Sequence, residues 1–388
     1  MNISFGIPNS FYGWAVLVRH SYSYSLVLVL AIVSKSPKHN TINAVREHHH
    51  NPAIHCTMLR ISELFGWFIV VCTCYCSALD VEISATDGTV VREGSLRSVV
   101  GAVPRIIYGT AWKKDATANL VYQAMHAGFR HIDTACQPKH YDEPGVGEGW
   151  KAASRELGLT RQDVWLQSKY TSVNGQDPNR IPYDEDAPLE EMVKQSLRKS
   201  LEQLQTDHLD SLVMHGPEDT REKLLAVWRV IEGCVEEGTV KRIGISNIYD
   251  VAAFRYLYEQ ARIKPAVVQN RFCADTNYDV EIRKFCIQHD IEFQSFWTLV
   301  ANQHFIRDRR VVKLAKKKGL TPELIMYATV MKLGITPLDG TTSREHMIED
   351  IALLHRIQSG EEIISDQELS ILVKILGIPN IKMDEEEH

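Results

Sequence analysis

From about residue 97 to the end of the chain, short apolar runs alternate with stretches whose apolar residues recur every three and four positions. The short runs are rich in β-branched and aromatic residues and predict strands, and the three-and-four spacing predicts amphipathic helices. Strands are predicted at residues 104–109, 129–133, 164–169, 209–215, 242–246, 267–271, 292–297 and 335–338. Helices are predicted at residues 115–126, 189–204, 222–237, 251–261, 280–289, 311–318 and 323–332. Gly128, Gly238, Gly319 and Gly334 follow helix patterns, where a left-handed residue ends a helix at the lowest cost.

The alternation of a strand with a helix, repeated eight times over about 290 residues, predicts an α/β fold of the (β/α)8 TIM-barrel type. A doubly wound open sheet uses the same local units and is the alternative. A Rossmann sheet would carry Gly-x-Gly-x-x-Gly after its first strand, whereas Gly109-Thr-Ala-Trp follows here. Polar residues gather instead at the C-terminal ends of several strands, which favours the barrel.

Residues 1–96 show no such alternation and predict a poorly ordered N-terminal extension before the barrel of residues 97–388. The apolar segment 64–79 is long enough for a signal-peptide core and approaches the length of a membrane helix. Residues 58–79 could be a membrane anchor, a cleaved secretory signal, or translated sequence outside the functional protein. We expect a cytoplasmic protein, with the membrane-anchored and secretory routes as alternatives.

Composition narrows the class of protein. The chain has 388 residues, 44% of them hydrophobic and 24% charged, which is typical of a globular protein. A formal net charge of -6 without a basic patch argues against nucleic-acid binding. The four cysteines beyond residue 97 lack metal-ligand spacing, and the histidine run 48–50 lacks acidic or cysteine partners. We therefore expect free thiols and no bound metal.

Four residues predict proton-transfer chemistry. Asp133, Lys169 and His215 stand at or just after the ends of consecutive predicted strands, and Tyr141 follows Asp133 by eight positions. Tyrosine is a poor acid at neutral pH unless a cation stabilises its anion. Lys169, held by Asp133, is expected to lower the pKa of Tyr141, and His215 can orient a substrate oxygen.

This set can protonate an oxygen during carbonyl reduction, but it contains no source of hydride. A nicotinamide cofactor could supply the hydride. Ser246, Asn247 and Gln269 offer hydroxyl and amide groups for its carboxamide, and Phe296 or Trp297 can stack on its ring.

The chain resembles the aldo-keto reductase family from about residue 100 to its end. The matching stretches are Gly109-Thr-Ala-Trp112, Gly128-Phe-Arg-His-Ile-Asp-Thr-Ala135, Ser168-Lys169, Met214-His-Gly-Pro217, Lys241-Arg-Ile-Gly-Ile-Ser-Asn247, Val268-Gln-Asn270 and the segment from Ile335 to Asp350. The resemblance implies a catalytic tetrad of Asp133, Tyr141, Lys169 and His215, with His215 also contacting substrate and Trp112 forming a wall of the substrate pocket.

The resemblance also implies the cofactor site. Its members are expected to be Thr110, Ser246, Asn247, Gln269, Phe296, Thr341, Thr342, Arg344, Glu349 and Asp350. Two features depart from the family pattern. The usual spacing from aspartate to tyrosine is five rather than eight, and the lysine and arginine that usually hold the adenosine 2′-phosphate after the eighth strand are replaced within Gly340-Thr-Thr-Ser-Arg-Glu-His346.

The resemblance implies an NADP-dependent oxidoreductase that reduces a small aldehyde or ketone to an alcohol without a metal. NADPH is the expected cofactor, and NAD is a possible one. We expect a monomer or weak dimer, with membrane contact only if segment 64–79 is a real anchor. The alternative is a weak or inactive barrel that binds a nucleotide and has a regulatory role.

Overall fold

A computed structural model describes residues 11–20, 23–32, 54–60, 70–76 and 105–378 of the chain. The chain divides into two units, residues 1–91 and residues 92–388, and each is described by itself. The predicted boundary between residues 96 and 97 lies outside the described residues.

The first unit contains two antiparallel strand pairs. Strand β1 (Phe11–His20) pairs with β2 (Ser23–Ile32), and β3 (Ile54–Arg60) pairs with β4 (Val70–Cys76). Strand β4 falls inside the apolar segment 64–79. Among the residues that the structure describes, no helix has the length and apolar character needed to cross a membrane. The proposed nature of residues 1–96 stays a prediction, because most of them lie outside the described ranges.

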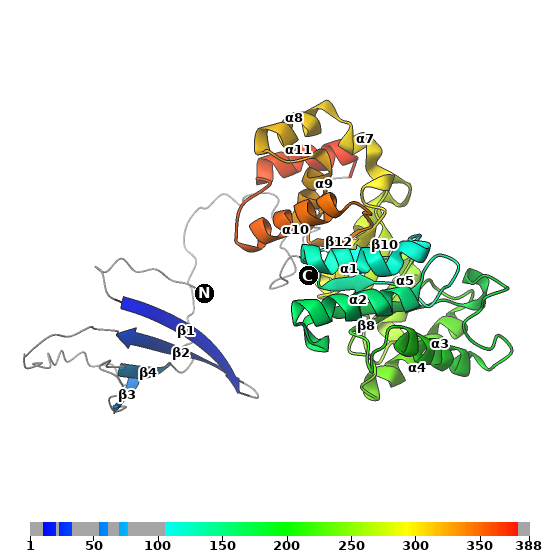
Figure 1. Ribbon diagram of the computed structural model, residues 1–388, viewed down its shortest axis with the longest axis horizontal. Coiled ribbons are helices and arrows are strands. Elements are labelled where there is room, and N and C mark those ends of the chain that lie inside the picture. The colour runs from blue at the N-terminus through cyan, green and yellow to red at the C-terminus, as the bar shows by residue number, and fades with distance from the viewer. Residues whose placement is uncertain (1–10, 21–22, 33–53, 61–69, 77–104, 379–388) are drawn as a thin grey trace, which may run out of the picture. The chain divides into compact units, whose positions relative to one another are not determined.

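The second unit is a closed barrel of eight parallel strands (Figure 1). The strands are β5 (Ile107–Gly109), β6 (His131–Asp133), β7 (Trp165–Tyr170), β8 (Ser211–Met214), β9 (Ile243–Ser246), β10 (Val267–Arg271), β11 (Glu292–Phe296) and β12 (Ile335–Asp339). Each strand pairs with its neighbour in sequence, and β12 closes the barrel on β5. The predicted TIM barrel is confirmed, and all eight predicted strands are present with ends that differ by up to three residues.

Helices connect the strands and cover the barrel. They are α1 (Thr117–Ala127), α2 (Glu143–Leu157), α3 (Leu189–Gln203), α4 (Arg221–Glu236), α5 (Val251–Gln260), α6 (Val280–Gln288), α7 (Gln303–Ile306), α8 (Arg309–Lys318), α9 (Pro322–Lys332), α10 (Arg344–Gln358) and α11 (Asp366–Leu376). Short 3-10 helices lie at Lys114–Ala116, Arg161–Asp163, Val173–Gly175, Ala274–Asp279 and Val300–Asn302. Figure 1 shows α8 to α11 gathered together on one side of the barrel. The glycines predicted to end helices, residues 128, 238, 319 and 334, all have positive φ angles.

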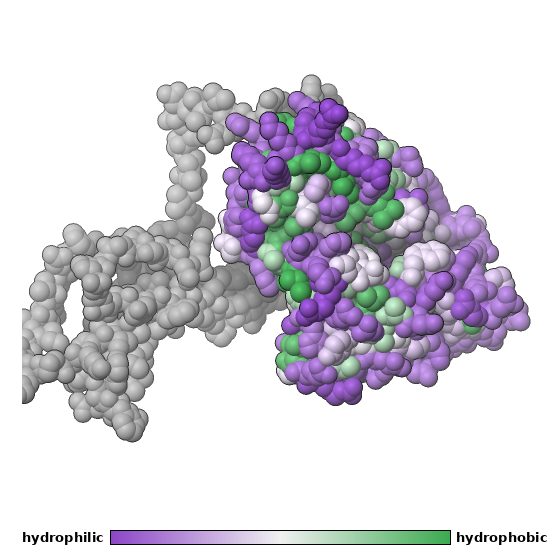
Figure 2. All heavy atoms as spheres, turned by 45° about the horizontal axis from the view of Figure 1, so that its top comes forward, coloured by the Kyte–Doolittle hydropathy of each residue, from purple (hydrophilic) through white to green (hydrophobic). Residues whose placement is uncertain are grey.

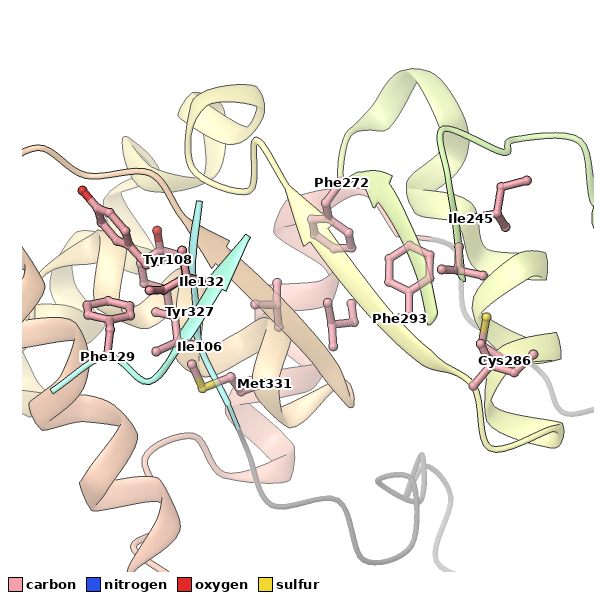
Figure 3. Close-up of a cluster of buried hydrophobic side chains, with 14 of the residues drawn as sticks. Ile106, Tyr108, Phe129, Ile132, Ile245, Phe272, Cys286, Phe293, Tyr327 and Met331 are labelled. Atoms are coloured by element: carbon pink, nitrogen blue, oxygen red, sulfur yellow. The ribbon is translucent and has the colours of Figure 1, made fainter. Parts of the chain in front are cut away.

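The core fills the space between strands and helices with apolar side chains. Figure 3 shows part of it, where Ile106, Tyr108, Phe129 and Ile132 pack together near Tyr327. In Figure 2 hydrophilic residues cover most of the visible face of the barrel, with a band of hydrophobic residues between them. Burial of these apolar surfaces drives the folding of the barrel unit.

Helix α2 is absent from the predicted helices, because its start is rich in residues with poor helix propensity. Gly145, Gly147 and Gly149 lie in its first two turns, whereas Pro144 stands at its start, where proline is tolerated. Tertiary contact explains the glycines: a Cβ atom at Gly147 would lie 2.1 Å from the backbone oxygen of Gln203 at the end of α3. A Cβ atom at Gly149 would lie 2.4 Å from the Ala118 oxygen in α1. The small residues therefore let α2 approach α1 and α3 closely.

This close approach predicts that Gly147→Ala destabilises the protein. The added methyl group overlaps backbone atoms that can only move with their helix, so we expect the free energy of unfolding to fall by about 1–3 kcal/mol. The control is Gly233→Ala in α4, where no heavy atom lies within 4 Å of the new Cβ. That change should raise stability by about 0.5–1 kcal/mol, because alanine favours a helix over glycine. Urea unfolding of both variants followed by circular dichroism tests this, and equal stability would contradict the packing argument.

Candidate active site

A cavity of about 920 Å³ opens at the C-terminal ends of the barrel strands. Its lining includes Asp133, Tyr141, His215, Gln269, Phe296 and Asp350, which come from different strand ends and from the loops and helices that follow them. This is the face at which TIM-barrel enzymes build their active sites. The volume is within the range of small-molecule and cofactor pockets.

Asp133 ends strand β6 and is only 2% exposed. Its Oδ2 atom accepts a hydrogen bond from Lys169 Nζ at 2.6 Å. Its Oδ1 atom accepts from Gln167 Nε2 at 2.7 Å and from Gln269 Nε2 at 2.9 Å. A buried carboxylate is costly unless charge and hydrogen bonds compensate it, and here both do. Lys169 is thus the cationic partner that the sequence predicts for the Asp133 carboxylate.

The two glutamines that hold Asp133 are themselves tied to a third. Gln294 Oε1 on β11 accepts from Gln167 Nε2 at 2.7 Å and from Gln269 Nε2 at 3.0 Å. These side chains come from β7, β10 and β11, so the network crosses the inside of the barrel. A polar layer of this kind fixes the position of Asp133 because each group in it is held by several partners.

Lys169 lies one pleat beyond Gln167 on β7 and is 1% exposed. Its Nζ atom also donates to the Thr134 carbonyl oxygen at 2.8 Å and lies 5.1 Å from the centre of the Tyr141 ring. Burial lowers the pKa of Lys169, but the Asp133 carboxylate and Tyr141 raise it more, so its net pKa is above the usual value. Lys169 is therefore an ammonium group held in one position near the Tyr141 ring.

The loop after β6 brings Tyr141 to the cavity despite its longer spacing from Asp133. The Gln137 carbonyl oxygen accepts from the backbone N–H groups of both His140 and Tyr141, at 3.2 and 3.1 Å. Burial raises the pKa of Tyr141, Lys169 lowers it and Asp133 raises it. The net pKa is above the usual value of tyrosine, so the expected net lowering is wrong. Burial of the phenol outweighs the nearby ammonium.

His215 follows β8 and faces Tyr141, with ring centres 5.8 Å apart in an edge-to-face arrangement. Its Nδ1 atom shares a hydrogen bond of 2.6 Å with Thr171 Oγ1. Burial, Lys169 and His140 lower the pKa of His215 to about 3. The ring is therefore neutral at physiological pH, and Nε2 is the nitrogen left to meet a ligand.

The residues predicted to hold a nicotinamide lie together at one side of the cavity. Ser246, Asn247, Gln269 and Phe296 all line it. Asn247 has a positive φ of 52°, and its Nδ2 atom donates to the His215 carbonyl oxygen at 2.7 Å. Ser246 Oγ donates to the Gln269 carbonyl oxygen at 2.6 Å. Hydroxyl, amide and aromatic groups thus line the cavity that Asp133 also lines, and such groups can hold a nicotinamide ring and its carboxamide.

Thr110, also predicted to contact the nicotinamide, is placed differently. It is fully buried, and its Oγ1 atom donates to the Asp133 carbonyl oxygen at 2.9 Å. The lining of the cavity includes its neighbours Gly109 and Ala111 rather than Thr110. In the structure its hydroxyl ties the end of β5 to β6.

Trp112 stands at the cavity rim and is 60% exposed. Its ring packs against that of His140 in a tilted arrangement, with centres 3.8 Å apart, and its backbone N–H donates to the His140 carbonyl oxygen at 2.7 Å. His140 belongs to the longer loop between Asp133 and Tyr141. The extra residues therefore build part of the pocket wall against the tryptophan predicted to contact substrate.

Arg271, at the end of β10, also lines the cavity, and sequence reasoning missed it. Its guanidinium lies 4.2 Å over the ring of Trp297, and its Nε atom is buried without a hydrogen-bond partner among the described residues. Arg271 stands two residues after Gln269, and this spacing places both side chains on one face of a strand. The same spacing of two residues relates Gln167 and Thr171 to Lys169. It also relates Gln294 to Phe296, so these three residues could have been predicted in the same way.

The predicted cofactor residues after β12 divide into two groups. Thr341, Glu349 and Asp350 line the cavity, whereas Thr342 and Arg344 are exposed and lie outside its lining. Lys113, which was not predicted, holds the loop in place: its Nζ atom donates to the carbonyl oxygens of Gly340 at 2.8 Å and Thr341 at 3.3 Å.

Two buried carboxyl groups, those of Asp339 and Asp350, line the cavity near β12 and α10. Asp339 ends β12, and its Oδ1 atom accepts from Tyr327 Oη at 3.2 Å and from the Thr341 N–H at 2.9 Å. Burial and the negative charge of Asp339 raise the pKa of Asp350 to about 9. Burial also raises the pKa of Asp339. Asp350 therefore carries a proton at neutral pH.

Comparison with known proteins shows what this chain is similar to. A profile of the Aldo/keto reductase family matches residues 105–368. The chain is 26% identical over 267 residues to a 9,11-endoperoxide prostaglandin H2 reductase of Trypanosoma cruzi, covering 68% of this chain and 86% of the relative. It is 27% identical over 230 residues to a glyoxal reductase of Bacillus subtilis, covering 59% and 75%. An aldo/keto reductase structure from Brucella melitensis superposes with a TM-score of 0.58 at 22% identity, covering 70% of this chain and 95% of that chain.

The environment of His215 predicts that its ring stays neutral throughout the physiological range. In folded protein the His215 ring signals in NMR should not shift between pH 8 and pH 5, because the pKa is about 3. The signals are assigned by their loss in His215→Asn. In urea-unfolded protein the same ring should titrate near pH 6.5. A midpoint near 6.5 in the folded protein would contradict the geometry.

The lowered pKa of His215 makes the free energy of unfolding depend on pH. Because the folded state resists protonation of His215, the unfolded state binds more protons below about pH 6.5. The contribution of this group to stability is therefore complete above that pH and is lost as pH falls toward 3. The free energy of unfolding of wild type should fall more steeply than that of His215→Asn between pH 6.5 and pH 4.

Proposed function

Because the chain belongs to the aldo/keto reductase family, we propose that it reduces the carbonyl group of a small aldehyde or ketone to an alcohol, with a nicotinamide dinucleotide as hydride donor. The observation that carries this proposal is the contact of Lys169 with both Asp133 and Tyr141, two residues that line one cavity. Its chemistry suits donation of a proton to an oxygen on which negative charge develops.

The residues present fit such a cofactor. Ser246, Asn247 and Gln269 supply donors and acceptors beside the tetrad, and Phe296 supplies an aromatic face. A bound reduced nicotinamide would supply hydride to the carbonyl carbon. The family resemblance favours NADPH and leaves NADH open.

In this proposal the Tyr141 hydroxyl gives its proton to the carbonyl oxygen as the carbonyl bond is reduced. The hydroxyl is protonated at neutral pH, and because burial raises its pKa, its acidity depends on stabilisation of the anion that forms when the proton leaves. The tyrosinate that remains is stabilised by the Lys169 ammonium 5.1 Å from the ring centre. Asp133 positions Lys169 through their hydrogen bond of 2.6 Å. Neutral His215 positions the carbonyl oxygen through Nε2, while Thr171 fixes the ring from Nδ1.

Small aldehydes are the first substrates to test. Relatives of the chain include a glyoxal reductase of Bacillus subtilis and a methylglyoxal reductase of Salmonella typhimurium, at 27% and 24% identity. The loops that border the cavity, which include His140, Ser172 and Gly175, set which carbonyl compound enters. We expect no metal requirement and a monomer or weak dimer.

Tyr141→Phe should lower kcat by at least about 100-fold, because the substituted side chain has no proton to give. Binding of the dinucleotide, measured by quenching of tryptophan fluorescence, should be retained. The matched control is Tyr122→Phe, since the Tyr122 hydroxyl bonds to Glu156 Oε2 at 2.6 Å on the outer face of α1 and α2. The control should keep wild-type turnover of methylglyoxal and a panel of aldehydes.

Two results would count against the proposal. Unchanged turnover in Tyr141→Phe would remove Tyr141 from the mechanism. Dinucleotide binding by wild type without turnover of any carbonyl compound would favour the alternative of a regulatory nucleotide-binding barrel.

We also propose that the protein is cytoplasmic, with an anchored or secreted form as the alternative. Fractionation of the natural protein and sequencing of its mature N-terminus test this. A mature chain that starts beyond residue 79 would indicate a cleaved leader, and recovery of the uncleaved chain with membranes would indicate an anchor.

A further inference from the structure

Glu143, the first residue of α2, carries a buried carboxyl group that the proposed reaction does not use. It is 2% exposed and stands two residues after Tyr141. It lies outside the lining of the cavity. Within residues 105–378, no ion pair includes this carboxyl group. A buried carboxyl group without a paired cation holds its proton more strongly than an exposed one.

Two serine hydroxyl groups hold the carboxyl group in place. Ser168 Oγ donates to Glu143 Oε1 at 2.5 Å, and Ser200 Oγ donates to Oε1 at 3.1 Å and to Oε2 at 3.0 Å. The two serine oxygens lie 3.2 Å apart. Ser168 belongs to β7 and Ser200 belongs to α3, so Glu143 joins the start of α2 to both elements.

This cluster can satisfy its hydrogen bonds with or without a proton on Glu143. As a carboxylate, the group accepts from both serines. As an acid, it can donate from Oε1 to Ser168, while Ser168 donates to Ser200 and Ser200 donates to Oε2. Each hydroxyl group then still has one acceptor. Protonation therefore changes the charge of the cluster and leaves its contacts in place.

The titratable groups around Glu143 come from the loop before α2 and from β7. The thiol of Cys136, in the loop, hydrogen-bonds to Glu143, and burial raises the pKa of this thiol, so it keeps its proton. Strand β7 contributes the ammonium group of Lys169. Helix α3 contributes the hydroxyl groups of Ser200 and of Ser196, which bonds to the thiol, and these do not titrate.

These surroundings oppose one another in their effect on Glu143. Burial raises its pKa, the serine and thiol donors and Lys169 lower it, and the net pKa is about 7. Two members of the tetrad titrate elsewhere, because the pKa of His215 is about 3 and the pKa of Tyr141 is above its usual value. Glu143 is therefore the group beside the tetrad whose charge changes around neutral pH.

Glu143 is connected to the proposed proton donor through Lys169. Ser168 and Lys169 are consecutive residues of β7, so their side chains lie on opposite faces of the strand. The attraction between Glu143 and Lys169 acts in both directions: the ammonium group lowers the pKa of the carboxyl group, and the carboxylate stabilises the ammonium group. A charged Glu143 also adds a second carboxylate, besides Asp133, to the surroundings in which a Tyr141 anion must form. Like charges oppose its formation.

We propose that Glu143 takes up and releases a proton while its serine cluster stays intact, and thereby controls how readily Tyr141 gives its proton to the substrate. The protonated form favours reduction, because the tyrosinate then forms near one carboxylate instead of two. Glu143 acts through Lys169 and lies outside the cavity lining, so it is a positioning residue. This inference rests on the proposed function, in which Tyr141 is the proton donor.

The single-turnover rate of dinucleotide oxidation by the full chain at saturating methylglyoxal, with NADPH and with NADH, tests the inference. In wild type this rate should fall by about threefold or more between pH 5.5 and pH 8.5, with a midpoint near pH 7. Glu143→Gln fixes the neutral form, and its rate should stay within about twofold of the low-pH rate of wild type throughout. Lys113 and Asp350, with pKa values of about 8 and 9, are present in both proteins, so the difference reports Glu143.

Two further variants serve as controls. Glu148→Gln removes a charge from an exposed position on the same helix, and it should keep the pH profile of wild type. Ser168→Ala removes a donor that lowers the pKa of Glu143, so the midpoint of the profile should move to higher pH. An unmoved midpoint in Ser168→Ala would overturn the inference even if Glu143→Gln fails to fold.

Infrared difference spectroscopy follows the proton without turnover. The C=O stretch of the protonated Glu143 carboxyl group should be present at pH 5.5 and lost at pH 8.5 in wild type. The same band should be missing from Glu143→Gln at both pH values. A band that does not change between the two pH values would overturn the proton exchange.

The outcomes distinguish the inference from the proposed function. Turnover with the same pH profile in wild type and Glu143→Gln would overturn the inference and leave the reductase intact. If wild type oxidises neither NADPH nor NADH with any carbonyl compound, the proposed function fails. The infrared result then decides by itself whether Glu143 exchanges its proton.

Discussion

The ion pair between Asp133 and Lys169 is the interaction on which the rest of the site depends. Both groups are almost completely buried, and each alone would be costly to remove from water. Their mutual hydrogen bond, the two glutamine amides on Asp133 and the Thr134 carbonyl on Lys169 compensate that cost. The pair therefore cannot move separately from the barrel, and the ammonium has one position relative to Tyr141. Rigidity of this kind is what a proton donor needs from its surroundings.

The fold was predictable because its signals are local and repeated. Parallel strands buried on both faces read as short apolar runs, and the positions of Gly128, Gly319 and similar residues mark helix ends. Helix α2 was missed because its glycines oppose helix formation locally. The reason for them is the approach of Gln203 and Ala118, which are distant in sequence. Only the assembled barrel shows why small residues are needed there.

The candidate site was predictable to a similar depth. Asp133, Lys169, His215 and the residues proposed to hold the carboxamide follow from polar residues at strand ends, and the structure places them around one cavity. The net pKa of Tyr141 was not predictable, since it depends on how much burial opposes Lys169. Thr110 looks from its sequence like a ligand contact, but its hydroxyl bonds to a neighbouring strand. The only sequence signal for Arg271 is its spacing of two residues from Gln269, and this signal is weak because an arginine at a strand end is more often a solvated charge.

The loop between Asp133 and Tyr141 brings Tyr141 to the cavity although the two residues are eight positions apart in the sequence. Gln137 O binds the N–H groups of His140 and Tyr141, and Trp112 binds the loop from the other side. These anchors, rather than a fixed number of intervening residues, set the position of the phenol. A signature search that demands a fixed interval would reject this chain, whereas a search for the three-dimensional anchors would accept it. The position of the phenol thus depends on these contacts, so a change in loop length that keeps them would leave Tyr141 in place.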